Sequence, residues 1–61
     1  MSTDIHGKIL SIGDKVHIVG KGKTVYYIIE LGENIAGVNV IKNSKDCYGV
    51  LLEKIVKFKN Q

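Results

Sequence analysis

The sequence predicts a small all-β domain in which five short strands close into a barrel. Runs of apolar and β-branched residues alternate with polar or glycine-rich turns, about every 8 to 12 residues. The strongest run, residues 25–31 (Val-Tyr-Tyr-Ile-Ile-Glu-Leu), consists almost entirely of residue types that favour strands. The chain has 61 residues, which is one domain's length, and a chain of that size buries only roughly 60% of its unfolded surface.

The charge balance allows contact with nucleic acid without requiring it. Nine basic residues, all of them lysine, outnumber six acidic residues and give a formal charge of +3. Lysine binds phosphate as a point charge, whereas arginine is the usual side chain for reading guanine edges. The absence of arginine therefore argues against sequence-specific recognition of bases.

The sequence carries no signal for a cofactor, a metal or a membrane. Cys47 is the single cysteine, so it cannot form a disulfide within the chain, and no group of Cys and His has the spacing of a zinc site. The first residues resemble no signal peptide, and no apolar run approaches about 18 residues. We therefore expect a cytoplasmic protein with no cofactor and no membrane partner.

The first part of the chain leads into a clear strand. Residues 1–5 are polar and are expected to be loose, as are residues 60–61. Residues 6–12 fit a short strand or an irregular lead-in equally well, and Gly13–Asp14 follows as a turn. Residues 15–19 then alternate as a strand does. The inward residues of this strand are Val16 and Ile18, and the outward residues are Lys15 and His17.

Residues 25–31 form the predicted central strand, around which the others pair. Successive side chains of a strand point to opposite faces. One set is apolar apart from a hydroxyl and is assigned to the core: Val25, Tyr27, Ile29 and Leu31. The other set is assigned to the outward face: Tyr26, Ile28 and Glu30. An exposed tyrosine beside an exposed isoleucine makes an apolar patch, and such patches usually mark contacts.

Turns of different kinds flank the central strand. Residues 20–23, Gly-Lys-Gly-Lys, are typical of a mobile hairpin loop, and residues 32–34 predict a tight reversal. Residues 35–42 form the next predicted strand, in which Gly37 marks a bulge or a sharp bend. One face of this strand carries Ala36, Val38 and Val40, and the other carries Gly37, Asn39 and Ile41.

A polar turn at residues 43–46 precedes a fourth strand, residues 47–51, in which Tyr48 shares the inward parity of Val50. The apolar spacing of residues 51–59 permits two interpretations. It fits a short amphipathic helix, or else a 3₁₀ turn at residues 52–54 and a last strand with Val56 and Phe58 inward. We favour the turn and strand, because five short strands complete a small barrel.

Two stretches resemble the small SH3-like barrels of bacteria, phages and plasmids, a group that includes KOW and Tudor-type modules. Residues 12–18 (Ile-Gly-Asp-Lys-Val-His-Ile) resemble the Gly-Asp-x-Val entry into their first strand. Residues 48–56 resemble their closing segment, where a glycine-led strand passes through a 3₁₀ turn. The resemblance covers roughly residues 12–59 and implies an SH3-like barrel, so we expect residues 1–61 to form a single domain of this kind. Leu52 stands where eukaryotic SH3 domains usually carry a proline, and their aromatic peptide groove has no match here.

The candidates for catalysis are few, namely Cys47, His6 and His17. Their spacing matches no nucleophile and base pair, and a chain this small cannot enclose a substrate as a monomer. We therefore expect no enzymatic activity and no catalytic residue.

Two binding hypotheses follow from these observations. The first is weak, sequence-independent binding of DNA or RNA, in which Tyr26 stacks on bases while lysines contact phosphates. The lysines assigned to it are Lys15, Lys21, Lys23 and Lys42. The alternative is a protein-interaction or oligomerisation module that uses Tyr26, Ile28 and Ile41. The two hypotheses differ in whether the lysines gather on the face that carries Tyr26.

Overall fold

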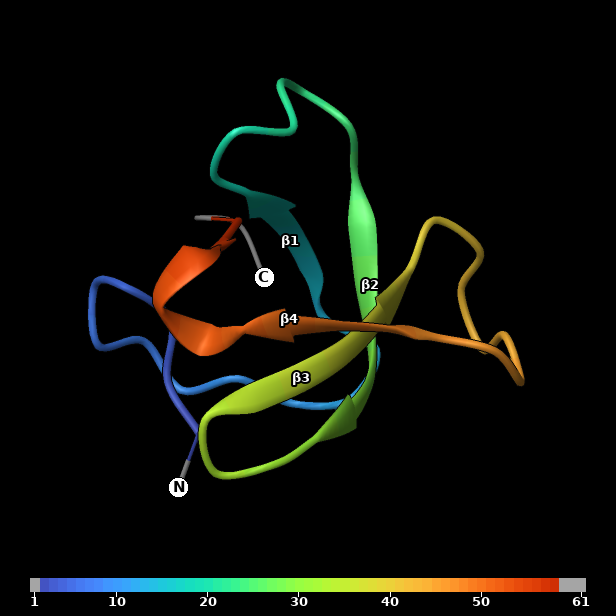
Figure 1. The fold of residues 1–61 in the computed structure, drawn as a ribbon, viewed down its shortest axis with the longest axis horizontal. Helices are drawn as coiled ribbons and strands as arrows, with labels where there is room; N and C mark the ends of the chain where they lie inside the picture. Colours follow the sequence, from blue (N-terminus) through green and yellow to red (C-terminus); the bar gives the residue numbers. More distant parts are fainter. Residues whose placement is uncertain (1, 59–61) are drawn as a thin grey trace.

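The computed structural model describes residues 2–58 and shows five strands in one antiparallel sheet (Figure 1). The strands are β1 (Lys15–Ile18), β2 (Tyr26–Leu31), β3 (Ile35–Asn39), β4 (Tyr48–Leu51) and β5 (Ile55–Lys57). Their order across the sheet is β4-β3-β2-β1-β5. Within the described residues no strand pairing joins β4 to β5, so the sheet curls without closing and keeps two edges. The predicted all-β class with five strands is confirmed.

The described part of the last segment is a turn and a strand. A 3₁₀ turn, η1 (Leu52–Lys54), connects β4 to β5, so the helical alternative is wrong. The inward residue of β5 is Ile55, which is fully buried opposite Ile18 of β1. Val56 and Phe58 were expected inward, but they lie on the other face of the strand.

Phe58 stacks on His17, and their ring centroids are 4.1 Å apart. His17 is therefore half-buried, although the alternation of β1 predicted a solvated side chain.

A β-bulge in β2 explains why its side chains were assigned to the wrong faces of the sheet. Ile28 lies opposite Val38, and the next pair joins Glu30 to Gly37, so Ile29 is the extra residue. Before the bulge the inward side chain is Ile28, which is completely buried. The assignment of Ile28 to an outward, partner-binding face is therefore wrong.

The predicted assignment of side chains to the two faces of β2 is wrong before the bulge and correct after it. Before it, Tyr26 lies opposite Val16 and packs against the core, so Tyr26 is not on the outward face. After it, Leu31 packs against the core as predicted. The apolar patch expected at Tyr26 and Ile28 does not exist, because both side chains are on the inner face.

The core lies inside the curl of the sheet and is small. Its buried apolar residues are Leu10, Val16, Ile18, Ile28, Ala36, Val38 and Ile55. Val16 and Ile18 are inward as predicted.

The third strand is shorter than predicted because Asn39 turns the chain out of the sheet. The Asn39 side chain is buried and donates to Ser44 Oγ (3.2 Å) and to the carbonyl of Asp46 (3.0 Å). Its Oδ1 accepts from the N–H of Ile41 at 3.0 Å. These bonds fold residues 40–47 into a loop, which leaves Val40 and Ile41 exposed outside the strand.

Gly37 lies opposite the bulge of β2, so the bulge that this glycine was expected to mark is in the neighbouring strand. A Cβ at position 37 would lie 2.5 Å from Sγ of Cys47, which packs over the glycine. The close approach of the loop to β3 therefore requires glycine at this position.

The N-terminal segment makes hydrogen bonds to β5 and to the β2–β3 turn. Thr3 bridges Ile9, Ser2 Oγ donates to the carbonyl of Gly32, and the Ile5 N–H donates to the carbonyl of Ile55. Residues 2–5, for which a loose start was expected, thus make hydrogen bonds to the rest of the fold. Residues 1, 60 and 61 lie outside the described part of the chain.

Candidate binding site at the free edge of β4

The outer edge of β5 is closed by the N-terminal segment. The Phe58 N–H donates to the carbonyl of Lys15, so the alternation of an antiparallel pair turns the main-chain groups of Ile55 and Lys57 away from β1. The carbonyl of Ile55 accepts from Ile5 at 3.0 Å, and the N–H of Lys57 donates to Asp4 Oδ2 at 2.8 Å. This edge therefore has no room for another strand.

The outer edge of β4 is open. Leu52 donates its N–H to the carbonyl of Asn34 at 2.9 Å. This bond shows which residues of β4 direct their main-chain groups toward β3 and which direct them away from it. By the same alternation, Val50 and Tyr48 bond to β3, whereas the N–H and C=O groups of Gly49 and Leu51 point away from it. Within residues 2–58, no strand or segment pairs with that side of β4.

An apolar groove of about 510 Å³ runs beside this edge, between β4 and the end of β1. It is lined by Ile18, Lys21, Tyr26, Val38, Val40, Tyr48, Gly49 and Val50. Tyr48 and Val40 remain 64% and 51% exposed, which is high for large apolar side chains beside a core. Such a surface is typical of a contact site.

A smaller cavity of about 270 Å³ continues the groove toward η1, because both share Ile18, Lys21, Gly49 and Val50. The charged residues that line the two cavities are Lys21 and Lys54. We call the two cavities together with the free edge the β4 groove.

The β4 groove includes only some of the residues singled out from the sequence. Tyr26 and Lys21 line it together. Lys15 is exposed next to the inward Val16, so it lies on the opposite face of the sheet from Tyr26.

Lys23 and Ile41 do not line the groove, and neither does Lys42. Lys23 is in the β1–β2 loop at the top of Figure 1, and Lys42 and Ile41 are in the β3–β4 loop at its right. The four predicted lysines therefore do not gather around Tyr26.

The residues that form the open edge were not predicted from the sequence. Tyr48 was expected in the core from its shared parity with Val50, yet it is largely exposed, because β4 is an edge strand at the rim of the sheet. The sequence of β4 gave no warning of this, because β4 contains no charged residue, whereas edge strands usually carry charges that discourage pairing.

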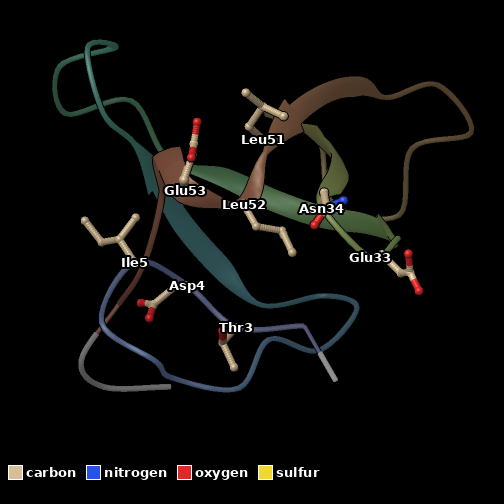
Figure 2. Close-up of a pocket in the computed structure, with 8 residues that line it drawn as sticks. All are labelled: Thr3, Asp4, Ile5, Glu33, Asn34, Leu51, Leu52 and Glu53. Carbon is tan, nitrogen blue, oxygen red and sulfur yellow. The ribbon is translucent and has the colours of Figure 1, made fainter.

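A third cavity, of about 420 Å³, lies on the other side of η1, between the N-terminal segment and the β2–β3 turn (Figure 2). Its lining includes the acidic residues Asp4, Glu33 and Glu53. Figure 2 shows that Glu33 and Glu53 extend in different directions from separate elements, so these side chains do not converge on one point.

Asp4 is already fully engaged by the main chain. Its Oδ1 accepts from the N–H groups of His6 and Lys8, both at 2.9 Å, and its Oδ2 accepts from Lys57. Burial raises the pKa of Asp4, but these three hydrogen bonds and the charge of His6 outweigh it and hold the pKa below the ordinary 3.8. Asp4 is therefore a structural carboxylate that ties residues 2–10 to β5.

Two of the three catalytic candidates among residues 2–58 are engaged in packing contacts. Cys47 packs over Gly37, while His17 stacks on Phe58. No set of three His, Cys, Asp or Glu residues in this range is arranged to hold a metal ion. None of the described helical segments has the length and apolar character to cross a membrane.

Comparison with protein-family models, with curated proteins and with solved structures finds no match to this chain.

Proposed function

We propose that this chain is a non-enzymatic protein-interaction module that accepts an extended strand at the free edge of β4. The observation that carries this proposal is the contrast between the two edges. The N-terminal segment satisfies the β5 edge, whereas Gly49 and Leu51 present four main-chain groups on the β4 edge that nothing else in residues 2–58 pairs with. A strand added there gains main-chain hydrogen bonds, and the apolar groove receives its alternate side chains.

The same architecture supports an open SH3-like barrel as the finer description of the fold. The β1 strand pairs with both β2 and β5, and a 3₁₀ turn leads from β4 into β5. These features fit the resemblance of residues 12–18 and 48–56 to such barrels. In this description, the β4 groove is the gap through which the barrel remains open.

Selection from a displayed library of random extended peptides tests the strand-binding function. We expect wild-type protein to enrich peptides with alternating apolar residues, because only one side of an added strand faces the groove. The variant Leu51→Pro should lose this enrichment. Position 51 has φ −63°, which proline adopts, and its N–H is not used by β3, so the fold tolerates the change.

Leu51→Ala is the matched control, because it shortens the same side chain and keeps the N–H. It should retain most of the enrichment. Equal enrichment on wild-type protein and on Leu51→Pro would show that the edge does not bind the peptides, and the proposed function would then be wrong.

Nucleic-acid binding is the second candidate, and the composition of the β4 groove favours it. The groove holds two tyrosines, Tyr26 and Tyr48, and both charged residues along it are lysines. Tyrosines provide stacking surfaces for unpaired bases, and lysines attract the phosphate backbone. The candidate phosphate contacts are therefore Lys21 and Lys54, with Lys15, Lys23 and Lys42 outside the groove.

Fluorescence anisotropy with single-stranded and duplex oligonucleotides at low salt tests this candidate. We expect weak binding to single strands that falls steeply as salt rises. Tyr48→Ala should weaken it by roughly 5- to 100-fold through lost stacking. Tyr27→Ala is the control, since this half-buried tyrosine does not line the groove. Absence of binding at low salt would exclude the candidate.

A further inference from the structure

We propose that the strand accepted at the β4 edge is β4 of a second copy of this chain, paired antiparallel about a two-fold axis at Val50. The proposal rests on the proposed function and names its partner. It follows from the positions of the unpaired main-chain groups, the residues around them and the charges at the ends of the strand.

The main-chain groups define one register in which both copies are satisfied. When Gly49 faces Leu51 of the second copy, each residue both donates and accepts a hydrogen bond across the interface. The symmetry repeats the pair on the other side of Val50. All four outward groups of each β4 are then used, and the two sheets join into one.

The side chains near the axis suit a self-complementary contact. In this register Val50 lies opposite Val50 of the second copy, and Tyr48 lies opposite Leu52 of the second copy. Tyr48 is 64% exposed in the single chain, so pairing covers a large apolar side chain that the fold itself leaves in water. No charged residue occurs within β4 to oppose the contact.

The charges beyond the strand ends are complementary in this register. Asp46 and Lys54 stand four residues before and after Val50, so each Asp46 comes toward Lys54 of the second copy. Both residues are exposed, and neither takes part in the ion pair between Lys57 and Asp14. Opposite charges at both ends favour this register over registers shifted along the strand.

Sedimentation velocity from micromolar to millimolar protein tests the association. We expect wild-type protein to shift from monomer to dimer over this range, and Leu51→Pro to raise the dimer Kd at least about tenfold, because it removes two interface donors. Leu51→Ala keeps the main-chain groups, so it should raise the dimer Kd by less than Leu51→Pro does. The circular dichroism of each variant reports whether it is folded.

Cysteine crosslinking tests the register. In a Cys47→Ser background, Val50→Cys places two thiols at a non-hydrogen-bonded pair, where Cα atoms lie about 4.5 Å apart and a disulfide can form. We expect rapid oxidation to a covalent dimer. Ile41→Cys in the same background is the control, because Ile41 is exposed but lies outside β4, and it should crosslink slowly.

The outcomes separate the two proposals. Suppose that the chain stays monomeric at millimolar concentration and still enriches peptides in a way that depends on the Leu51 N–H. In that case the proposed pairing with a second copy is wrong, and the strand-binding function stands. Failure of both experiments would overturn both. Dimerisation unaffected by Leu51→Pro, or crosslinking through position 41 instead of 50, would place the contact elsewhere and contradict this interface.

Discussion

Replacing Ile28 with alanine is expected to lower the free energy of unfolding by roughly 3 to 4 kcal/mol. Ile28 is fully buried in the central strand, opposite the equally buried Val38. Truncation removes its apolar surface from the core and leaves a cavity that the surrounding strands fill only in part. A 61-residue domain has a total stability of roughly 3 to 9 kcal/mol, so Ile28→Ala brings the chain close to unfolding.

Urea unfolding followed by circular dichroism measures the effect. Ile28→Val extends the series, with an expected loss of about 1 kcal/mol, and it stays measurable if the alanine variant does not fold. Ile41→Ala is the matched control, because this isoleucine is 64% exposed, and its loss should be within about 0.5 kcal/mol. An Ile28→Ala cost as small as that of Ile41→Ala would mean that Ile28 faces solvent, as simple alternation along the strand predicted.

The contrast between Ile28 and Leu31 shows what alternation can predict. A period of two holds as long as the strand is regular, so Val16 and Ile18 of β1 were assigned correctly. The extra residue Ile29 shifts the phase by one, and Val-Tyr-Tyr-Ile-Ile-Glu-Leu contains no glycine or proline to reveal it. The outward signal from β2 was therefore an artefact of an undetected bulge.

The candidate site was harder to predict than the fold for a related reason. Turns and strand composition are local, and they located the reversals at residues 20–23 and 32–34. Whether a strand is central or at an edge depends on which distant segments pair with it. The exposure of Tyr48 follows from the position of β4 at the end of the sheet order, and no local pattern in residues 47–51 contains that information.

Replacing Asp4 with alanine is expected to cost about 2 to 4 kcal/mol at neutral pH. The carboxylate accepts three main-chain N–H groups, from His6, Lys8 and Lys57, and its removal leaves these donors unsatisfied beside the β5 edge. Asp4→Asn should lose somewhat less, because one oxygen remains while the new amide group opposes a donor. Thermal or urea unfolding at constant pH measures both.

The pH dependence identifies the charged form of Asp4 as the stabilising one. Its pKa in the folded chain lies below 3.8, so the unfolded chain takes up the proton first as the pH falls. The stability that Asp4 contributes is therefore present above about pH 5 and is lost as the pH drops through 3.8 toward the lower folded pKa. The difference in unfolding free energy between wild type and Asp4→Asn should shrink over the same interval.

Glu33→Gln separates this effect from the general loss of negative charge. Glu33 is an exposed carboxylate across the same cavity, and no hydrogen bond or ion pair engages its side chain within residues 2–58 (Figure 2). Its substitution should change stability by no more than about 0.5 kcal/mol at any pH. If Asp4→Asn behaved like Glu33→Gln, the Asp4 carboxylate would not fasten residues 2–10 to β5. The closure of the β5 edge would then depend on the hydrogen bond from Ile5 to Ile55 alone, and the contrast with β4 on which the proposed function depends would be weaker.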